Sequence, residues 1–543
     1  MSRAEIIKDP RSGELFGPTY RDIIAESTNG SRIWEFFSYN QKGELLYGPR
    51  FYNSEGRLIQ DGVNIPELIS RYGSPLEVVD PVIAQIRARQ WDEMFANVAT
   101  QVEYRLDGNF RSFATKAAPA MEIVTAAIGA GWSPEASSEQ DIYNAIWLKK
   151  HDLLPDWVKI LANGYKFPPE GKYSRLDPLS DGFRMRSYAE MIVDANIAGI
   201  RVVPIIDSLA EIPFFGSKRV PKMEVGIRFK AYGKKPGISF EELPARHGET
   251  WEGVVKAARE LTEQGHLLTT FHAMISAADS VPVDEFVGSL LEAVNYFFEL
   301  RKHYPSLEHF NIGGGMPTLS SNYDHEGFLT KLLTGLKVMA EKSGQTMPIL
   351  DVEFGTYISA EAGIAVLQLE NIKVNGVESG GVRIPWGVSK GSYNREIIDQ
   401  WLLAVRYKGL AGNYANNRSR LMRLGDSTCD KQGILLTDAK RPNTIFMPRV
   451  PEGARDLIVV IPEQQAYEEA LTGIGGVQYC LSAEAKDIII VRDKDGRVTG
   501  ELVQNNQNPD RTLHLLGYNI ENIPHMRRFE DSRGPASRYQ GYF

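Results

Sequence analysis

Side chains able to do chemistry stand at the ends of several short apolar runs in this chain. Lys116 lies in "FATKAAP", where burial among small apolar neighbours would lower the pKa of its amine and favour a Schiff base with an aldehyde. His272 ends the run "TTFH", and Glu353 lies in "ILDVEFGTY". Three glycines, at 313–315, follow "HFNI" and would either form a tight turn or bring backbone donors to a phosphate.

Each of these residues also has a purely structural explanation. A lysine can extend from a strand end into solvent, a lone histidine is commonly a core residue, and a glutamate can pair with an arginine. Together they supply what a phosphate-bearing aldehyde cofactor needs: an amine for the aldehyde, a flat partner for the ring, backbone donors for the phosphate and an acid group for the ring nitrogen. The glycine run is not G-x-G-x-x-G, so a Rossmann-type dinucleotide site is not favoured.

Short strands that alternate with helices would have to position this set. Eight strand-like runs occur between residues 110 and 355, with amphipathic helical patterns such as 251–266 and 283–304 between them. Eight such units over about 250 residues predict a closed (β/α)8 barrel, with an open doubly wound sheet as the alternative. A barrel holds its reacting groups at the C-terminal ends of its strands, where all four features fall. The predicted strands are 110–117, 131–138, 158–164, 200–207, 223–230, 267–275, 307–315 and 348–355.

The rest of the chain has a different sequence pattern. Residues 38–62 are typical of hairpins, and after residue 365 six short runs separated by Gly, Pro, Asn and Asp predict an all-β region with one helix, at 393–409. We therefore expect an α/β + β fold, a (β/α)8 barrel with a C-terminal all-β domain joined by N-terminal strands. The expected units are an extension (1–80), the barrel (81–362) and the β domain (363–543). The six runs are 443–450, 454–462, 477–482, 486–493, 496–503 and 511–518.

Composition narrows the class of partner. The 543 residues include 61 basic and 69 acidic side chains, a net charge of −8 that argues against a nucleic-acid surface and favours a small-molecule partner. Only two cysteines occur, which argues against a disulfide-built secreted protein. The first residues lack the apolar core of a signal peptide, and no long apolar run predicts a membrane span. We expect a cytoplasmic protein and predict no metal ligands.

The motifs resemble those of a known family, the pyridoxal-phosphate decarboxylases with an alanine-racemase-like barrel, which act on ornithine, arginine and diaminopimelate. The resemblance covers most of residues 71–530, and its segments occur in the family's order. The segment "ILANGYK" (160–166) looks most like the biosynthetic arginine decarboxylases. The six matching segments are 71–80, 113–142, 309–317, 351–363, 425–433 and 513–524.

The resemblance implies a role for each matched residue of the barrel. Lys116 would bind pyridoxal phosphate covalently and release it to the substrate amine. His272 would stack on the ring, and Glu353 would keep the ring nitrogen protonated, which makes the ring an electron sink. The phosphate would be held by Gly313, Gly314, Gly315 and the hydroxyl of Tyr518.

Two further residues would complete the site from another subunit. Cys429 would return a proton to Cα after decarboxylation, since an acidic thiol can do so. Asp430 would face the distal amine or guanidinium of the substrate. In this family both residues enter the active site of the partner subunit, so the resemblance implies a homodimer with shared sites.

The chain departs from the family pattern near the phosphate. The family often has E-P-G-R at the glutamate, whereas Glu353 is followed by Phe, Gly and Thr356, so a phosphate-binding arginine is missing. Arg228 or Lys230, at the end of the fifth strand, would be candidates to compensate. Residues 378–394 match no family segment, although substrate-end residues are often found there.

Several activities remain open at the level of sequence. The first interpretation is decarboxylation of a basic amino acid, arginine before ornithine or lysine, within polyamine biosynthesis. A diaminopimelate-type or D-amino-acid decarboxylase is an alternative, although Asp430 stands where the diaminopimelate group usually carries glutamate. A racemase is a further alternative on the same barrel. The last is a non-catalytic homologue with a regulatory binding role; such proteins generally lose the lysine or the cysteine, and both are present here.

Overall fold

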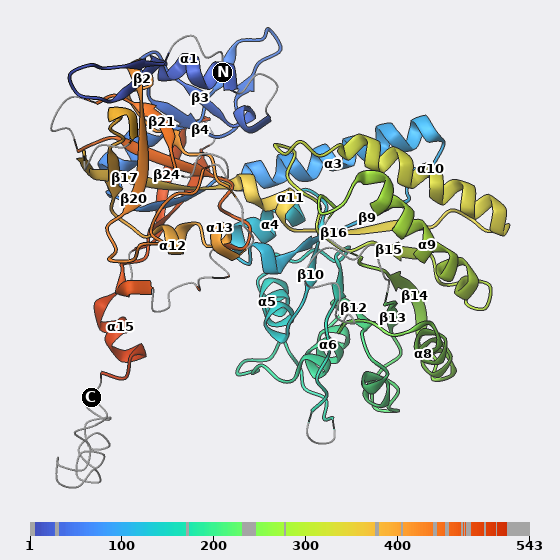
Figure 1. The fold of residues 1–543 in the computed structure, drawn as a ribbon. Helices are drawn as coiled ribbons and strands as arrows, with labels where there is room; N and C mark the ends of the chain where they lie inside the picture. The colour runs from blue at the N-terminus through green and yellow to red at the C-terminus, as the bar shows by residue number, and fades with distance from the viewer. Residues whose placement is uncertain are drawn as a thin grey trace, which may run out of the picture.

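The computed structural model shows two bodies that share one boundary (Figure 1). One is a closed β/α barrel, and the other is a mainly β domain that combines N-terminal strands with the later part of the chain. The predicted fold class is therefore confirmed. The structure describes residues 6–27, 32–169, 173–230, 246–275, 278–374, 379–402, 406–437, 443–450, 455–468, 471, 473, 479–493, 496–505 and 508–518.

The eight predicted barrel strands all exist and pair in parallel. Their order is β10-β11-β12-β13-β14-β15-β16-β9, and the pairing of β16 with β9 closes the barrel and excludes the open doubly wound sheet. Strands buried on both faces are rich in apolar residues, as the sequence runs are. The strands are β9 (Asn109–Ala114), β10 (Ser133–Ala136), β11 (Lys159–Ala162), β12 (Arg201–Ile206), β13 (Glu224–Arg228), β14 (Leu267–His272), β15 (His309–Asn311) and β16 (Ile349–Phe354).

Helices surround this barrel, and polar caps set where several of them begin. Ser138 accepts a hydrogen bond from the backbone of Asp141, and Thr250 accepts one from Gly253, so each satisfies a free N–H of a first turn. The helices predicted at 251–266 and 283–304 are α8 and α9. The outer helices are α3 (Pro81–Val102), α4 (Met121–Gly129), α5 (Glu139–Lys150), α6 (Tyr188–Ile197), α8 (Trp251–Glu263), α9 (Val283–Arg301) and α10 (His325–Ser343). Short turns of helix follow β9, β12 and β16: η2 (Thr115–Ala117), η3 (Leu209–Glu211), α7 (Ile212–Phe215), α11 (Thr356–Ser359) and η4 (Ala360–Ala362).

The β domain is built on one large sheet. Its main path is β1-β2-β20-β18-β17-β8-β23-β24, so N-terminal strands do join strands from the far end of the chain. The strand β8 pairs antiparallel with β17 and parallel with β23. The strands are β1 (Ile7–Lys8), β2 (Leu15–Thr19), β8 (Leu76–Val79), β17 (Gly363–Lys373), β18 (Trp386–Ser389), β19 (Leu410–Ala411), β20 (Arg418–Asp426), β21 (Ile445–Pro448), β22 (Ile458–Pro462), β23 (Lys486–Arg492) and β24 (Val498–Gln504).

The N-terminal region adds small hairpins to this sheet. The hairpins predicted at 38–62 are present as two separate pairings. Their strands are β3 (Phe37–Tyr39), β4 (Leu45–Tyr47), β5 (Phe51–Tyr52), β6 (Leu58–Gln60) and β7 (Val63–Asn64). The helical turns of this region and of the later sheet are α1 (Tyr20–Ser27), η1 (Arg32–Glu35), α2 (Ile65–Tyr72) and η5 (Ser379–Gly381).

Three predicted elements of the later half are wrong. The helix predicted at 393–409 is broken into α12 (Tyr393–Glu396) and α13 (Asp399–Leu402), because Ile397 leaves the helical region at φ −143°. The described part of the strand predicted at 477–482 is the 3-10 turn η6 (Tyr479–Leu481). The strand predicted at 511–518 is the helix α15 (Pro509–Leu515), since Asn508 caps its start and Pro509 occupies its first turn.

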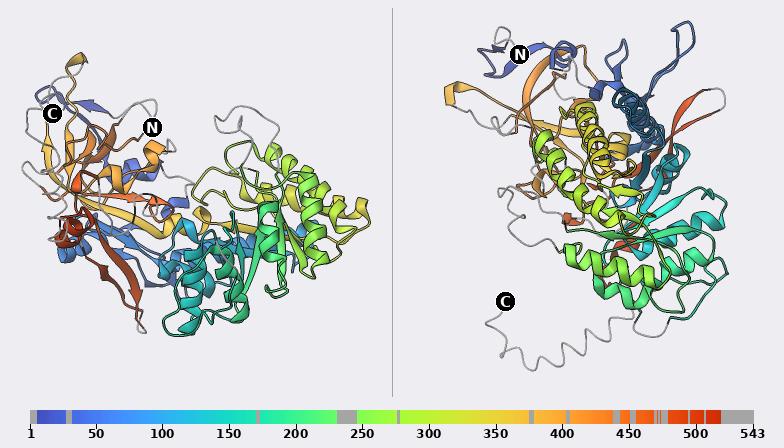
Figure 2. Two further views of the ribbon diagram at one scale, coloured as in Figure 1. Left: turned by 90° about the horizontal axis from the view of Figure 1, so that it is seen from below. Right: turned by 90° about the vertical axis from the view of Figure 1, so that its right-hand side faces the viewer.

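A buried ion pair holds the turn that leads from the barrel into the β domain. Arg87 of α3 donates to both carboxylate oxygens of Glu361 in η4, at 2.6 and 2.7 Å, and also to Glu35 at 2.6 Å. The turn η4 leads directly into β17, which carries the chain from the barrel into the large sheet. Figure 2 shows the β domain at one side of the barrel in its left view. The pair therefore fixes the element that connects them.

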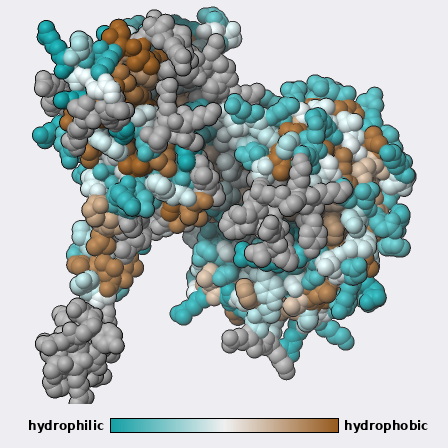
Figure 3. Space-filling view, in the orientation of Figure 1, coloured by the Kyte–Doolittle hydropathy of each residue, from teal (hydrophilic) through white to brown (hydrophobic). Residues whose placement is uncertain are grey.

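The visible surface is mixed, with hydrophobic residues at several places on the β domain and on the helix α15 (Figure 3). Leu513 and Leu515 of α15, and Leu516 directly after it, are exposed. Within the described part of the chain, no helix is both long enough and apolar enough to span a membrane.

Candidate active site

Lys116 follows β9 at the C-terminal mouth of the barrel. It lies in η2, where its side chain is open to solvent but partly enclosed by the barrel mouth, rather than buried among small neighbours as the sequence predicted. The carboxylate of Glu135 raises the pKa of the Lys116 amine, with smaller contributions from Tyr467 and Glu353, and burial only partly opposes them. The predicted lowering of this pKa is therefore wrong, because a nearby negative charge outweighs the loss of solvent.

Glu353 ends β16 and is held by two amide side chains. Asn163 donates to its Oε2 at 2.9 Å, and Asn311 donates to its Oε1 at 2.7 Å. Glu353 is only 5% exposed, and this burial raises the pKa of its carboxyl, although the amides and Lys116 act in the opposite direction. A buried carboxylate of this kind is stabilised by any cation brought to it.

Glu135 is a second carboxylate at the barrel mouth, and the sequence analysis did not single it out. It is the next-to-last residue of β10 and is 1% exposed. Its Oε1 accepts from Asn163 at 2.9 Å and from Ser137 at 2.9 Å, while its Oε2 is buried without a hydrogen-bond partner among the described residues. Burial raises the pKa of Glu135 to about 7, and Lys116 opposes this increase.

His272 ends β14 with one ring nitrogen bonded. Its Nδ1 lies 3.1 Å from the Oδ1 of Asn163, whereas its Nε2 is buried and has no partner among the described residues. Burial lowers the pKa of His272 well below its usual value, and the positive charges of Arg228 and Lys116 lower it further. The ring is therefore neutral, as a flat stacking partner should be.

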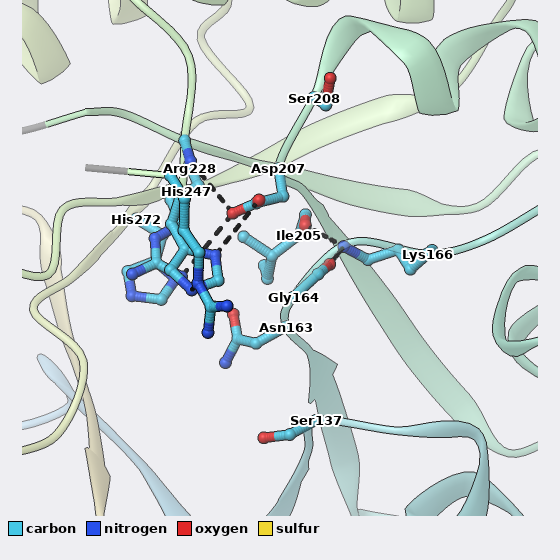
Figure 4. A network of polar contacts seen from close by, with 12 residues as sticks. Ser137, Asn163, Gly164, Lys166, Ile205, Asp207, Ser208, Arg228, His247 and His272 are labelled. Atoms are coloured by element: carbon cyan, nitrogen blue, oxygen red, sulfur yellow. Dashed lines mark hydrogen bonds and ion pairs between the residues drawn. The ribbon is translucent and has the colours of Figure 1, made fainter. Parts of the chain in front are cut away.

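Charged residues line the neighbouring strand ends (Figure 4). Arg228, from β13, lies 3.7 Å from Asp207, which also lies 3.4 Å from Nδ1 of His247. Lys166 is fully buried, contacts Glu211 at 3.2 Å and donates to the carbonyl oxygens of Gly164 and Ile205. Arg228, which the sequence offered as a compensating cation, thus lies among these charged strand ends, and its charge also acts on Glu353.

The local backbone geometry explains why glycine occupies positions 313–315. Gly313 and Gly315 adopt φ of 70° and 81°, a region that favours glycine. A side chain on Gly314 would place its Cβ 2.5 Å from the backbone oxygen of Glu353. The run lets β15 end against β16, and its predicted contact with a phosphate stays a prediction.

Three predicted site residues do not join this cluster within one chain. Cys429 and Asp430 follow β20 in the β domain, where Cys429 is exposed and Asp430 accepts from Asn394 at 3.1 Å. Tyr518 follows α15 and is 72% exposed. The tyrosine that lies beside Lys116 is instead Tyr467, whose backbone N–H donates to Ala117 at 2.8 Å.

The strand-end rule could have found some of the missed residues. Glu135 is the next-to-last residue of β10, Asn163 directly follows β11 and Asn311 ends β15, so they occupy the same rim as Lys116 and Glu353. No comparable sequence signal marks Tyr467, because it reaches the barrel from the β domain.

These residues fit the cofactor that the resemblance implies. The exposed amine of Lys116 is available to an aldehyde, and the buried carboxylate of Glu353 suits a protonated ring nitrogen. The Nε2 of His272 and the Oε2 of Glu135 are buried without hydrogen-bond partners among the described residues, while Asn163 contacts the other polar atom of each side chain. Among the described residues, no group of three or more His, Cys, Asp or Glu is placed to hold a metal ion.

Comparisons with known proteins find similarity to amino-acid decarboxylases. No protein-family model matches the chain. It is 20% identical over 415 residues to a diaminopimelate decarboxylase of Staphylococcus aureus, covering 73% of this chain and 86% of the relative. It is 22% identical over 382 residues to a biosynthetic arginine decarboxylase of Pseudomonas putida, covering 64% of this chain but only 54% of that protein.

Solved structures share the fold over nearly the whole chain. The biosynthetic arginine decarboxylase of Campylobacter jejuni superposes with a TM-score of 0.69 at 16% identity, covering 93% of this chain and 94% of that one. A lysine decarboxylase variant in complex with PLP gives a TM-score of 0.54 at 17% identity, covering 81% of this chain and 96% of that one. The resemblance stated from the sequence is thus confirmed.

Proposed function

We propose that this chain is a pyridoxal-phosphate-dependent decarboxylase that converts a basic amino acid to the corresponding amine and carbon dioxide. Arginine is the first candidate substrate, followed by ornithine and lysine. The observation that carries the proposal is the meeting of Lys116, Glu135, His272 and Glu353 at one end of a barrel shared with amino-acid decarboxylases.

The residues of the barrel would each contact a different part of the cofactor. Lys116 would hold the cofactor covalently and then give way to the substrate amine. Glu353 would bind the ring nitrogen, and the neutral ring of His272 would lie against the cofactor. The 313–315 loop would bind the phosphate. When bound, pyridoxal phosphate supplies an electron sink for the electron pair left at Cα.

The β domain would complete the reaction from a second subunit. Cys429 is exposed in this chain and would protonate Cα in the partner's site. Asp430 would bind the distal cation of the substrate. We therefore propose a homodimer with shared sites, located in the cytoplasm, with the barrel over 81–362 and the β domain over 363–543. Polyamine biosynthesis is the proposed context.

A diaminopimelate substrate is the second candidate. The diaminopimelate decarboxylase relative is covered over 86% of its length, against 54% for the P. putida arginine enzyme. Asp430 argues for a cationic substrate end, because a carboxylate repels the second carboxylate of diaminopimelate.

A substrate panel tests the proposal. Purified protein loaded with pyridoxal phosphate would be given L-arginine, L-ornithine, L-lysine, D-arginine and meso-diaminopimelate, and carbon dioxide release would be measured. We expect the wild-type protein to release carbon dioxide from one L basic amino acid. The Lys116→Ala variant should release none from any of the substrates. Release from meso-diaminopimelate alone would support the second candidate. Tight cofactor binding without release from any substrate would contradict both and favour a binding role.

A further inference from the structure

One amide side chain contacts three of the residues assigned to the site. Asn163, at the turn after β11, is 7% exposed. Its Nδ2 donates to Oε1 of Glu135 and to Oε2 of Glu353, each at 2.9 Å, and its Oδ1 lies 3.1 Å from Nδ1 of His272. Figure 4 shows Asn163 beneath His272 and Arg228. No other described side chain bonds to all three.

The chemistry of these groups fixes the direction of each bond. A carboxylate can only accept, so the amide nitrogen, with its two hydrogens, must face Glu135 and Glu353. The amide oxygen then faces the ring, and it can only accept. The hydrogen on His272 must therefore sit on Nδ1, which leaves the lone pair on Nε2, the atom without a partner.

A second asparagine follows the same logic on the other side of Glu353. Asn311 donates from Nδ2 to Oε1 of Glu353 at 2.7 Å, and its Oδ1 accepts from the backbone N–H of Gly313 at 2.8 Å. Neither amide can be reversed without facing oxygen to oxygen. Both oxygens of Glu353 are consequently bound by donors, an arrangement that stabilises the ionised form.

We infer that Asn163 is a positioning residue that fixes His272 in the Nδ1–H tautomer and, by donating to both Glu135 and Glu353, favours their ionised forms. The inference rests on the proposed function for its catalytic meaning, since a neutral ring and an ionised Glu353 are what a protonated cofactor ring requires. The hydrogen bonds of Asn163 and the tautomer of His272 do not depend on a cofactor.

The buried lysine of the next turn supports this role. Lys166 donates to the carbonyl of Gly164, which directly follows Asn163, and to that of Ile205 in β12. Gly164 has φ of 74°, so the chain turns sharply there. The ammonium therefore fixes the backbone that carries the amide.

Two substitutions separate the two roles of Asn163. Asn163→Leu removes every hydrogen bond at similar size. Asn163→Asp keeps an acceptor for His272 but cannot donate to the carboxylates. A matched control is Asn196→Leu, because Asn196 of α6 also donates its amide to backbone oxygens, those of Ile192 and Val202, away from this site.

The first readout needs no cofactor. Nitrogen chemical shifts of histidine-labelled protein report the tautomer of each of the nine histidines, and His272→Gln identifies the signal of His272. We expect the Nδ1–H tautomer in the wild type, in Asn163→Asp and in Asn196→Leu, and its loss in Asn163→Leu. An Nδ1–H tautomer that persists in folded Asn163→Leu would overturn the inference.

The second readout is the pH at which bound cofactor is lost on acidification. The near-visible absorption of the cofactor reports this loss. The charged groups that act on Glu353 are Lys116, Arg228 and Glu135. Loss of the hydrogen bonds that Asn163 donates should raise the pH at which cofactor is lost by about one unit in both Asn163 variants, and not in Asn196→Leu. An unchanged pH of cofactor loss in both variants would contradict the inference. A wild-type chain that binds no cofactor would instead count against the proposed function, while the tautomer readout still stands.

Discussion

At the scale of single residues, the charge that surrounds Lys116 controls its reactivity. Its amine must be neutral to react with an aldehyde, but Glu135 raises the pKa of this amine and keeps it protonated to higher pH. Burial raises the pKa of Glu135 to about 7, although Lys116 lowers it, so the two groups titrate as a unit. The pH dependence of the reaction is therefore a property of the pair.

Glu135→Gln tests this coupling. Removing the carboxylate removes the largest cause of the raised Lys116 pKa, so a larger fraction of the amine is neutral at pH 8. We expect reaction with pyridoxal phosphate at pH 8 to be about three- to tenfold faster, because each pKa unit changes that fraction up to about tenfold. Stopped-flow absorbance over a pH series measures the rate. Glu139→Gln, on α5, is the control; an unchanged profile in Glu135→Gln would contradict the assignment.

At the same scale, the strand-end rule accounts for what the sequence could show. It located Lys116, His272 and Glu353, because parallel barrel strands bring their ends to one rim. It did not show that Asn163 would bridge two carboxylates, since that contact depends on strand order and register around the closed barrel. The pKa of Lys116 was predicted with the wrong sign for the same reason: Glu135 is a neighbour in space.

At the scale of elements, the glycine run is a packing requirement of two strands. Gly314→Ala would place a Cβ 2.5 Å from the carbonyl oxygen of Glu353, so β15 and β16 would have to separate at the site. We expect a loss of about 1–3 kcal/mol in the free energy of unfolding, together with weaker cofactor binding. Thermal or urea unfolding measures the first quantity.

Gly288→Ala is the matched control for that substitution. Gly288 lies in α9, and a Cβ there would meet no atom within 4 Å. Helix propensity then favours alanine by about 0.5–1 kcal/mol. Equal stability of the two variants would show that the close contact at Gly314 does not constrain the strands.

The connection between the two bodies gives a second prediction at this scale. Arg87→Met would leave the buried carboxylate of Glu361 without its bidentate partner. We expect a loss of about 3–5 kcal/mol in the free energy of unfolding, the usual cost of breaking a buried pair from one side. The double variant Arg87→Met/Glu361→Leu should recover much of this loss in the same unfolding assay. A single variant as stable as the wild type would contradict this account of the junction.

Elements of the later half show where sequence patterns were insufficient. Alternating apolar residues at 511–518 predicted a strand, but an Asn cap and a proline in the first turn start the helix α15. The amphipathic pattern at 393–409 is interrupted at Ile397. In both places local backbone chemistry decides the structure, whereas the barrel strands were predictable because long-range burial and local pattern agree.

At the scale of the whole molecule, the chain provides only part of the proposed site. Lys116 belongs to the barrel, whereas Cys429 and Asp430 lie with the β domain of the same chain. Sequence could name these residues but could not place them, since their proposed role depends on the proposed assembly. A second copy related by a two-fold axis would bring each β domain to the other barrel.

Mixing two inactive variants tests this shared site. Lys116→Ala and Cys429→Ala would be combined after dissociation and reassociation. Random pairing makes about half of the dimers mixed, each with one intact site, so about a quarter of the wild-type activity should return if sites are shared. Carbon dioxide release measures the recovery. Activity no higher than that of the separate variants would mean that both residues serve a site within one chain.

The most direct test of the central claim is the near-visible absorption of the protein with pyridoxal phosphate, before and after borohydride. We predict a yellow band that borohydride abolishes, with the reduced cofactor found by mass spectrometry on the peptide carrying Lys116, and neither signal in Lys116→Ala. A chain that gives no band, or that is labelled on another lysine in both proteins, would contradict the claim that this barrel mouth is a pyridoxal-phosphate site.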